Sequence, residues 1–411
     1  MYDAIVIGAR CAGSPTAMLL AQKGYRVLLV DKMTFPSDIM STHYIHPVGI
    51  ASLKRWGLLD RVKRSNCPPV RRILFDFGSF TLSGATLPTD GVAEAYVPRR
   101  KILDKILVDA AVEAGVEFRE NFAVQEILME GDRVVGIRGG SPGDAPVTEK
   151  ASIVIGADGM RSLLARHVGA PIYHARPTFS CAYYTYWSGV PMQAVELYPR
   201  KRCTLIAFPT NDDLVCIAIG WTIDQFPVIR TDVESHYMKT LELAPRLAER
   251  VRQGKQEERF VGSGDIPNFF RKPYGPGWAL VGDAGYHKDP VLGHGISDAF
   301  RDAELLADAI DAGMSGRQPL ESALADYERQ RNEIALPIYE INSQFASQEP
   351  PSAEMRLLFQ ALRTNQSETE RFFAALEGTI SPAEFFAPEN MAHIISSAGL
   401  QLPQENQQAP A

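Results

Sequence analysis

The segment GARCAG, residues 8–13, has the residue types and spacing of a turn that binds a dinucleotide. It follows an apolar run at 3–7 and precedes a helical stretch at 15–22. The first glycine permits a tight bend and the last lets the helix pack closely on the strand, so that backbone N–H groups face a pyrophosphate. A carboxylate after the second apolar run, 26–30, can accept from ribose hydroxyls. The expected nucleotide contacts are Gly8, Cys11, Ala12, Gly13, Asp31 and Lys32. A tight turn without a ligand is the alternative.

Arg10 stands where such turns have their middle glycine. Its guanidinium can reach over the phosphates as a charge-assisted donor. A solvated surface arginine is the other interpretation. The sequence leaves both open.

Two later segments identify the dinucleotide by resemblance. IVIGADGMRS, 153–162, and GWALVGDAGYHKDPVLGHGISDAFRDA, 277–303, follow GARCAG in the order found in group A flavoprotein monooxygenases. The chain resembles this family, whose type member is p-hydroxybenzoate hydroxylase, over about residues 1–340. The resemblance implies one non-covalent FAD, with NAD(P)H as a transient co-substrate and dioxygen as the oxidant.

The resemblance also assigns cofactor-binding residues. In the family, the positions of Asp158 and Gly159 help to hold FAD and the nicotinamide, Asp283 bonds the ribityl or ribose part, and Arg100 (less so Arg99) reaches the phosphates. The backbone around Val124 would meet the adenine. The loop expected beside the flavin ring contains Pro290, Gly293, His294, Gly295 and Ile296. The chain departs from the common family residues at Tyr286, His294 and Ser297, which leaves ring contacts from those side chains in doubt.

A helix expected over 297–312, ended by Gly313, gives this loop a physical role. Its N-terminus carries a partial positive charge of about half a unit. Reduced flavin is anionic at its pyrimidine edge, so this dipole would stabilise it. An ordinary helix after a glycine loop is the alternative.

Candidate reaction and substrate residues lie in two further segments. In STHYIHP, 41–47, His43 or His46 could bond the flavin or act as a general base, because imidazole titrates near neutral pH. In the expected strand FSCAYYTYWSG, Tyr183 and Trp187 face one side and Tyr184 and Tyr186 the other. One set would line an apolar pocket for an aromatic substrate, although core packing explains either set equally well. The candidates for substrate contact are His46, Tyr183, Tyr184, Phe208 and Trp221.

These residues require an α/β fold with a Rossmann-like, three-layer FAD-binding domain. Continuous apolar strands at 3–7, 26–30 and 278–281 indicate a buried parallel sheet. Aromatic and β-branched strands between 179 and 222 predict a second, mostly antiparallel sheet domain. We expect a discontinuous FAD-binding domain, a substrate domain and a C-terminal helical region, with boundaries 1–70, 96–172 and 262–320; 71–95 and 173–261; and 321–411.

Several smaller elements are also predicted. Helical spacing occurs at 47–64, 100–114, 320–346 and 353–378. A hairpin is expected from 123–129 and 133–137, and GIRGGSPGD, 136–144, is interpreted as a turn because no helix follows it. The tail after Leu402 is expected to be frayed.

Composition excludes several function classes. The net charge of −7 and the short basic clusters argue against nucleic acid as a partner. No apolar run approaches the roughly 20 residues that span a bilayer. Five cysteines without a C-x-x-C pair, and a start without a signal peptide, indicate the cytoplasm. His287 and His294 lack further ligands for a metal site. A monomer and a homodimer are both possible.

The expected function is hydroxylation of a hydrophobic, aromatic small molecule with NAD(P)H and dioxygen, through a flavin hydroperoxide. The resemblance leaves three alternatives. These are an FAD-dependent reductase of carbon–carbon double bonds similar to geranylgeranyl reductases, a non-catalytic flavin-binding subunit, and a tryptophan halogenase. The last is disfavoured because IGWTIDQFP lacks the second tryptophan of a W-x-W-x-I-P run.

Overall fold

A five-stranded parallel sheet forms the centre of the first structural unit. The computed structural model describes residues 1–401. The strands run in the order β20-β10-β1-β2-β7, and each pairs in parallel with its neighbour. They are β1 (Tyr2–Ile7), β2 (Val27–Val30), β7 (Glu117–Arg119), β10 (Val147–Gly156) and β20 (Trp278–Leu280). Their apolar runs are continuous because both faces of the sheet are covered.

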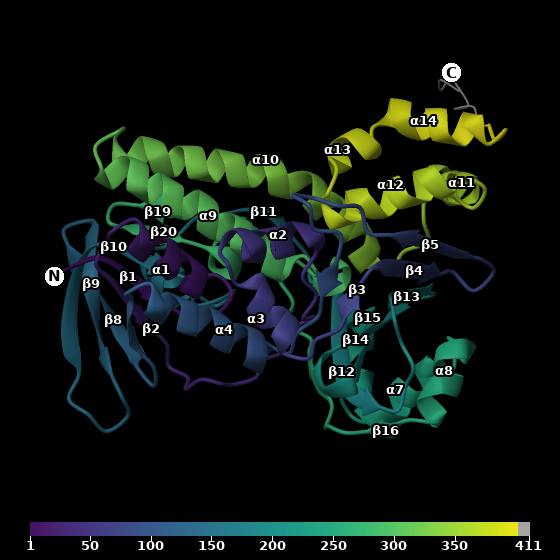
Figure 1. The fold of residues 1–411 in the computed structure, drawn as a ribbon, viewed down its shortest axis with the longest axis horizontal. Coiled ribbons are helices and arrows are strands. Elements are labelled where there is room, and N and C mark those ends of the chain that lie inside the picture. Colours follow the sequence, from purple (N-terminus) through teal and green to yellow (C-terminus); the bar gives the residue numbers. More distant parts are fainter. Residues whose placement is uncertain (402–411) are drawn as a thin grey trace, which may run out of the picture.

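Two further layers cover this sheet. Helices α1 (Gly13–Gln22), α4 (Arg100–Glu113) and α9 (Gly295–Met314) pack on one face. The other face meets the antiparallel strands β8 (Ala123–Glu130) and β9 (Arg133–Gly140), which continue into the first half of β10 (Figure 1). The predicted three-layer α/β fold is confirmed, as is the hairpin.

A second, mostly antiparallel sheet lies beside the first unit. Its order is β16-β12-β15-β14-β13-β4-β5, with β17 also on β12, and only the β13–β4 pair is parallel. The strands are β4 (Arg72–Asp76), β5 (Thr81–Ala85), β12 (Ser180–Ser188), β13 (Val195–Arg200), β14 (Cys203–Pro209), β15 (Val215–Thr222), β16 (Lys255–Gln256) and β17 (Val261–Ser263). Strands β4 and β5 join this sheet from an early part of the chain, as a discontinuous division into domains requires. The exact domain boundaries stay our proposal.

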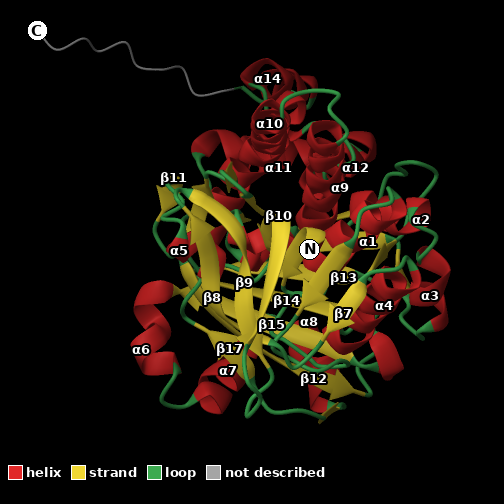
Figure 2. Cartoon of the chain, turned by 90° about the vertical axis from the view of Figure 1, so that its left-hand side faces the viewer, coloured by secondary structure: helices red, strands yellow, loops and turns green. Residues whose placement is uncertain are grey.

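Helices cover both faces of the second sheet. Helices α7 (Val233–Leu241) and α8 (Pro245–Arg252) pack on one face. The C-terminal helices α11 (Ala353–Leu362), α12 (Gln366–Glu377), α13 (Pro382–Phe385) and α14 (Pro388–Ser397) share a core with the other face. They follow the long helix α10 (Leu320–Ser347), and Figure 2 shows them gathered on one side of the strands.

Short elements complete the described chain. They are α2 (Pro47–Arg55), α3 (Leu59–Arg64), β3 (Pro69–Val70), β6 (Ala95–Tyr96), α5 (Leu163–His167), β11 (Ile172–Arg176), η1 (Asn211–Asp213), η2 (Ile223–Gln225), α6 (Phe226–Ile229), β18 (Asn268–Arg271), β19 (Tyr274–Gly275), η3 (Gly282–Ala284), β21 (Tyr286–His287) and η4 (Pro290–Leu292). Within residues 1–401, no helix has both the length and the apolar character needed to cross a bilayer.

The structure corrects three of the predicted helices. The stretch 47–64 is two helices, since the chain turns at Gly57, whose φ is +73°. Likewise, 353–378 divides into α11 and α12. Helix α9 begins at Gly295 and runs through Gly313, where an added Cβ would lie 2.7 Å from the Cα of Leu320. Gly313 therefore permits close packing and does not end the helix. The predicted frayed tail lies outside the described residues.

Candidate functional site

Three glycine-containing turns, far apart in the sequence, meet at the carboxyl ends of β1, β10 and β20. A Cβ added at Gly8 would lie 2.4 Å from the carbonyl oxygen of Ala157, and one at Gly13 would lie 1.7 Å from that of Gly8. A Cβ at Gly282 would lie 2.7 Å from the Cβ of Ala12. Only glycine fits these positions, so the three motifs form one backbone cradle. Ligands of open parallel sheets bind at this edge.

The predicted ribose carboxylate lies at the end of β2. Asp31 is buried, and its two oxygens accept from the backbone N–H groups of Ala9 and Met33, each at 2.8 Å. The N–H of Phe122 donates to the carbonyl of Asp31, which places the start of β8, with the half-buried Val124, beside this end of β2. Lys32 is exposed.

The buried carboxylate of Asp104, on α4, binds both candidate phosphate-binding arginines. Nη1 of Arg10 donates to one oxygen at 2.5 Å, and Nε of Arg100 donates to the other at 3.0 Å. The thiol of Cys11 lies 3.3 Å from the same carboxylate, and burial raises the pKa of this thiol. Nη2 of Arg10 also donates to the hydroxyl of Ser37. Arg10 is thus paired with a buried carboxylate, and its contact with the cofactor phosphates stays a prediction.

Arg100 keeps more of its donors free than Arg10. Among the described residues, its Nη groups make no hydrogen bond, and the charge of Asp283 acts on it. Asp283 is exposed although Gly282 and Ala284 on either side are buried. The structure therefore brings these two predicted residues together beside the glycine cradle.

The N-terminus of α9 faces open space. A Cβ added at Gly295 would meet no atom within 4 Å, and no side chain caps the helix in the described chain. Its neighbours His294 and Ile296 are buried, and Gly293 has a φ of +72°. The uncapped N–H groups leave the helix dipole available to a ligand.

Asp158 carries an unpartnered atom near the same cradle. Its Oδ2 accepts from the N–H of Leu163 at 2.6 Å, whereas Oδ1 is buried with no partner among the described residues. Burial raises the pKa of this carboxyl. Gly159, which follows it, has a φ of +80°. Uncapped helix starts, a free guanidinium edge and carboxylates together match the phosphates and hydroxyls of a dinucleotide, so the residues fit the expected cofactor.

His43 is held in the core, and its role as a general base stays a prediction. Its ring is fully buried, Nε2 bonds the hydroxyl of Tyr186, and Nδ1 has no partner in the described chain. Burial, aided by the nearby positive charge of Arg100, lowers the pKa of His43 to about 3. An imidazole with so low a pKa is a weak proton acceptor near neutral pH.

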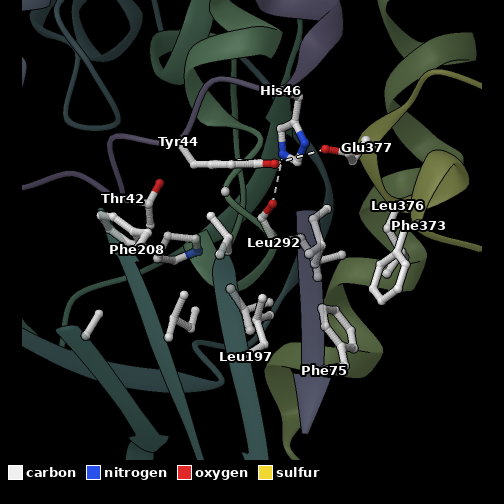
Figure 3. Close-up of a pocket in the computed structure, with 17 residues that line it drawn as sticks. Thr42, Tyr44, His46, Phe75, Leu197, Phe208, Leu292, Phe373, Leu376 and Glu377 are labelled. Atoms are coloured by element: carbon white, nitrogen blue, oxygen red, sulfur yellow. Dashed lines mark hydrogen bonds between the residues drawn. The ribbon is translucent and has the colours of Figure 1, made fainter. Parts of the chain in front are cut away.

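An apolar pocket adjoins the flavin-loop segment Pro290–Gly293 (Figure 3). Its floor is the face of the second sheet that includes Phe75, Leu197 and Phe208, and its wall is α12 with Phe373. The remaining lining residues are Thr42, Tyr44, His46, Ile73, Val195, Ile206, Ala218, Leu376 and Glu377.

The strand alternation predicted for β12 is correct, and it divides the substrate candidates. Phe208 and His46 line the pocket, and Tyr184 shares their core, 5.9 Å from the ring of His43. Tyr183 and Trp221 pack on the opposite face, under α7 and α8. The sheet separates them from this pocket, so the pocket does not support their predicted contact with substrate, which stays a prediction.

The sequence interpretation missed a polar group at one end of the pocket. The hydroxyl of Tyr44 donates to Oε1 of Glu377 at 2.9 Å. Nε2 of His46 donates to the carbonyl of Leu292 at 3.0 Å, and its ring stacks 4.1 Å from that of His294. Glu377 lies beyond the region of family resemblance, and no motif in its helix marks it.

No group of three or more histidine, cysteine or acidic side chains in residues 1–401 could hold a metal ion. All five cysteines are free and buried.

Comparison with known proteins agrees with this geometry. Residues 1–220 match the family model described as FAD binding domain. The chain is 26% identical over 338 residues, covering 81% of this chain and 83% of the relative, to the digeranylgeranylglycerophospholipid reductase of Methanocella arvoryzae.

Solved structures share the fold over nearly the whole chain. The myxobacterial chondrochloren halogenase CndH superposes with a TM-score of 0.76 at 22% identity, covering 98% of both chains. A Pseudomonas aeruginosa protein, described as a probable FAD-dependent monooxygenase, superposes with a TM-score of 0.71 at 20% identity, covering 92% of this chain and 99% of that one. The chain belongs to the FAD binding domain family and is an FAD-dependent oxidoreductase.

Proposed function

We propose that this protein is an NAD(P)H-dependent monooxygenase that hydroxylates a hydrophobic, aromatic small molecule. The observation that carries the proposal is the shared boundary of two sites. The segment Pro290–Gly293 lines the apolar pocket, and it leads directly into the uncapped N-terminus of α9 beside the glycine cradle. A substrate in the pocket would therefore lie against the cofactor loop.

Residues of the cradle would hold the cofactor by complementary chemistry. The N–H groups at the starts of α1 and α9 would face anionic parts, Arg100 would pair with phosphate, and Asp283 would accept from hydroxyls. FAD, when bound, supplies the electron transfer and the activation of dioxygen.

The pocket residues would exclude water and orient the substrate. Phe75, Leu197 and Phe373 form apolar walls around the site, and the ring of Phe208 lies 6.3 Å from that of His43. Such walls bind flat hydrophobic rings and keep solvent from the reacting atoms.

The proposal is tested with purified protein, NAD(P)H, labelled dioxygen and a panel of hydrophobic aromatic compounds. We expect bound FAD, faster NAD(P)H consumption with some compounds, and a product that carries one atom of the labelled dioxygen. NAD(P)H consumption that yields only hydrogen peroxide with every compound would argue against hydroxylation.

A second candidate is reduction of a carbon–carbon double bond in a lipid-like substrate. The apolar pocket suits such a substrate, and the matched relative from Methanocella arvoryzae is a digeranylgeranylglycerophospholipid reductase. This function would convert polyisoprenoid compounds under anaerobic conditions with reduced FAD, whereas a monooxygenase would require dioxygen.

A further inference from the structure

Glu377 lines the apolar pocket and has one carboxyl oxygen without a hydrogen-bond partner among the described residues. The side chain is 0% exposed and lines the cavity. Its Oε1 accepts from Tyr44, whereas Oε2 has no hydrogen-bond partner among the described residues. A buried polar atom left without a partner is unfavourable, so this oxygen favours binding of a group that completes its hydrogen bonding.

The position of Glu377 within its helix is also unfavourable to a carboxylate. It is the last residue of α12, and Gly378 follows it in the left-handed conformation. The C-terminus of a helix carries partial negative charge, which destabilises an anionic side chain there. Neither helix formation nor core packing accounts for a glutamate at this position.

A second unsatisfied atom belongs to the same end of the pocket. His46 donates from Nε2 to the carbonyl of Leu292, so its Nδ1 is an acceptor, and this atom is buried without a partner in the described chain. Figure 3 shows His46, Tyr44 and Glu377 grouped at one end of the cavity, away from Phe75 and Leu197. The pocket is therefore amphipathic, with one polar end and an apolar body.

We infer that Glu377 binds a hydroxyl group of the substrate, so that the pocket selects hydrophobic molecules that carry a hydroxyl at one end. The inference rests on the proposed function for the identity of the pocket as a substrate site. A hydroxyl can both donate and accept. It can therefore pair with Oε2 in either protonation state, whereas a purely apolar molecule would leave both orphan atoms unpaired.

Glu377 thus acts as a specificity-determining residue, and Tyr44 is its positioning residue. Tyr44 holds Oε1 and so fixes the carboxyl group of Glu377 at the polar end of the cavity. The loop carrying Tyr44 is further fixed by the backbone N–H of His46, which donates to the hydroxyl of Ser297 on α9 at 3.1 Å. The polar end is therefore built from the first unit of the molecule and from a C-terminal helix.

The test measures equilibrium binding to the FAD-loaded protein without NAD(P)H. The probes are 1-naphthol, 1-methoxynaphthalene and naphthalene, which share one ring system and differ in the polar group. Because the hydroxyl of 1-naphthol completes the hydrogen bonding of Oε2 and naphthalene leaves that atom unpaired, we expect 1-naphthol to bind roughly tenfold or more tightly than naphthalene. Glu377→Leu should remove this preference, and Glu377→Gln should retain part of it.

Phe373→Leu is the matched control because it alters the neighbouring apolar wall of the same helix. It should weaken naphthol and naphthalene binding in parallel and leave their ratio unchanged. Far-UV circular dichroism and FAD absorbance establish that each variant is folded. If Glu377→Leu does not fold, the test rests on Glu377→Gln, in which the ratio of the affinities for 1-naphthol and naphthalene should be smaller than in the wild-type protein.

Three results would overturn the inference. These are equal wild-type affinities for naphthol and naphthalene, a preference that survives Glu377→Leu (or is unchanged in Glu377→Gln), and no binding of any probe. The proposed function fails separately, because it requires an oxygenated product whereas this selectivity requires neither NAD(P)H nor dioxygen. Oxygenation with unselective binding would overturn the assignment of Glu377 alone.

Discussion

The hydroxyl of Tyr44 donates to the carboxyl of Glu377 across 333 residues of sequence. A second bond of the same kind lies beside it, since Nε2 of His294 donates to the carbonyl of Leu376 at 2.7 Å. Both bonds join the end of α12 to segments next to the cofactor cradle. The C-terminal helices therefore complete the pocket and are part of the site.

Burial of Glu377 makes the stability of the protein depend on pH. Burial raises the pKa of this carboxyl from 4.5 to about 8. Between these values the folded chain holds a proton that the unfolded chain has released, so this contribution to stability falls as the pH rises. We expect wild-type stability, relative to Glu377→Gln, to fall by roughly 2–4 kcal/mol between about pH 5 and pH 8.

Urea unfolding of both proteins at each pH, with the same FAD concentration, measures this difference. His43, His46 and His294 are common to both proteins, so their titration cancels in the comparison. Parallel pH curves for the two proteins would show that the carboxyl of Glu377 is ionised throughout this range.

Arg100 should contribute more to FAD binding than Arg10. Nη1 of Arg10 donates to Asp104 and its Nη2 donates to Ser37. Among the described residues, Arg100 donates only from Nε, to Asp104. A charge-assisted hydrogen bond is worth about 1.5–3 kcal/mol, so Arg100→Ala should weaken FAD binding roughly 10- to 150-fold. Arg10→Ala should have a smaller effect.

Titration of FAD into the apo-proteins, followed by fluorescence quenching, gives both affinities. Equal losses would indicate that Arg10 leaves Asp104 when the cofactor binds. A larger loss in Arg10→Ala would contradict the assignment of the phosphate contact to Arg100.

The cofactor cradle could be predicted from sequence because its constraints are local. Gly8 and Gly13 are required by close backbone approach within a few residues, and a strand, turn and helix in succession place them together. The partner of Arg10 could not be predicted in this way. Asp104 lies on a different helix, and nothing in its spacing distinguishes it from a solvated carboxylate.

The substrate side was less predictable for a physical reason. Alternation along β12 correctly separated Tyr183 from Tyr184, but both faces of the sheet are buried under helices. Which face holds the pocket depends on how α7, α8 and α12 dock. Glu377 had no sequence signal, since a single glutamate at the end of an amphipathic helix is typical of exposed surface.

The two faces of the second sheet should respond differently to substitution. Phe208→Leu removes aromatic surface from the pocket wall and should weaken binding of 1-naphthol and naphthalene alike. Tyr183→Phe alters the opposite face, so it should leave both affinities unchanged. The same equilibrium binding assay compares them. A loss of binding in Tyr183→Phe similar to that in Phe208→Leu would contradict the assignment of the ligand to the face of the sheet that carries Phe208.

Asp283 should be required for retention of FAD. It is exposed beside the buried Gly282, whose packing against Ala12 brings it to the cradle, and its charge acts on Arg100. Asp283→Ala removes a carboxylate that would accept from FAD hydroxyls, so the purified variant should carry much less flavin than the yellow wild-type protein.

Asp308→Ala is the matched control, because Asp308 lies on α9 with its side chain 73% exposed and paired with Lys23. The ratio of flavin absorbance to protein absorbance measures retention. Equal flavin content in both variants would remove Asp283 from the cofactor site.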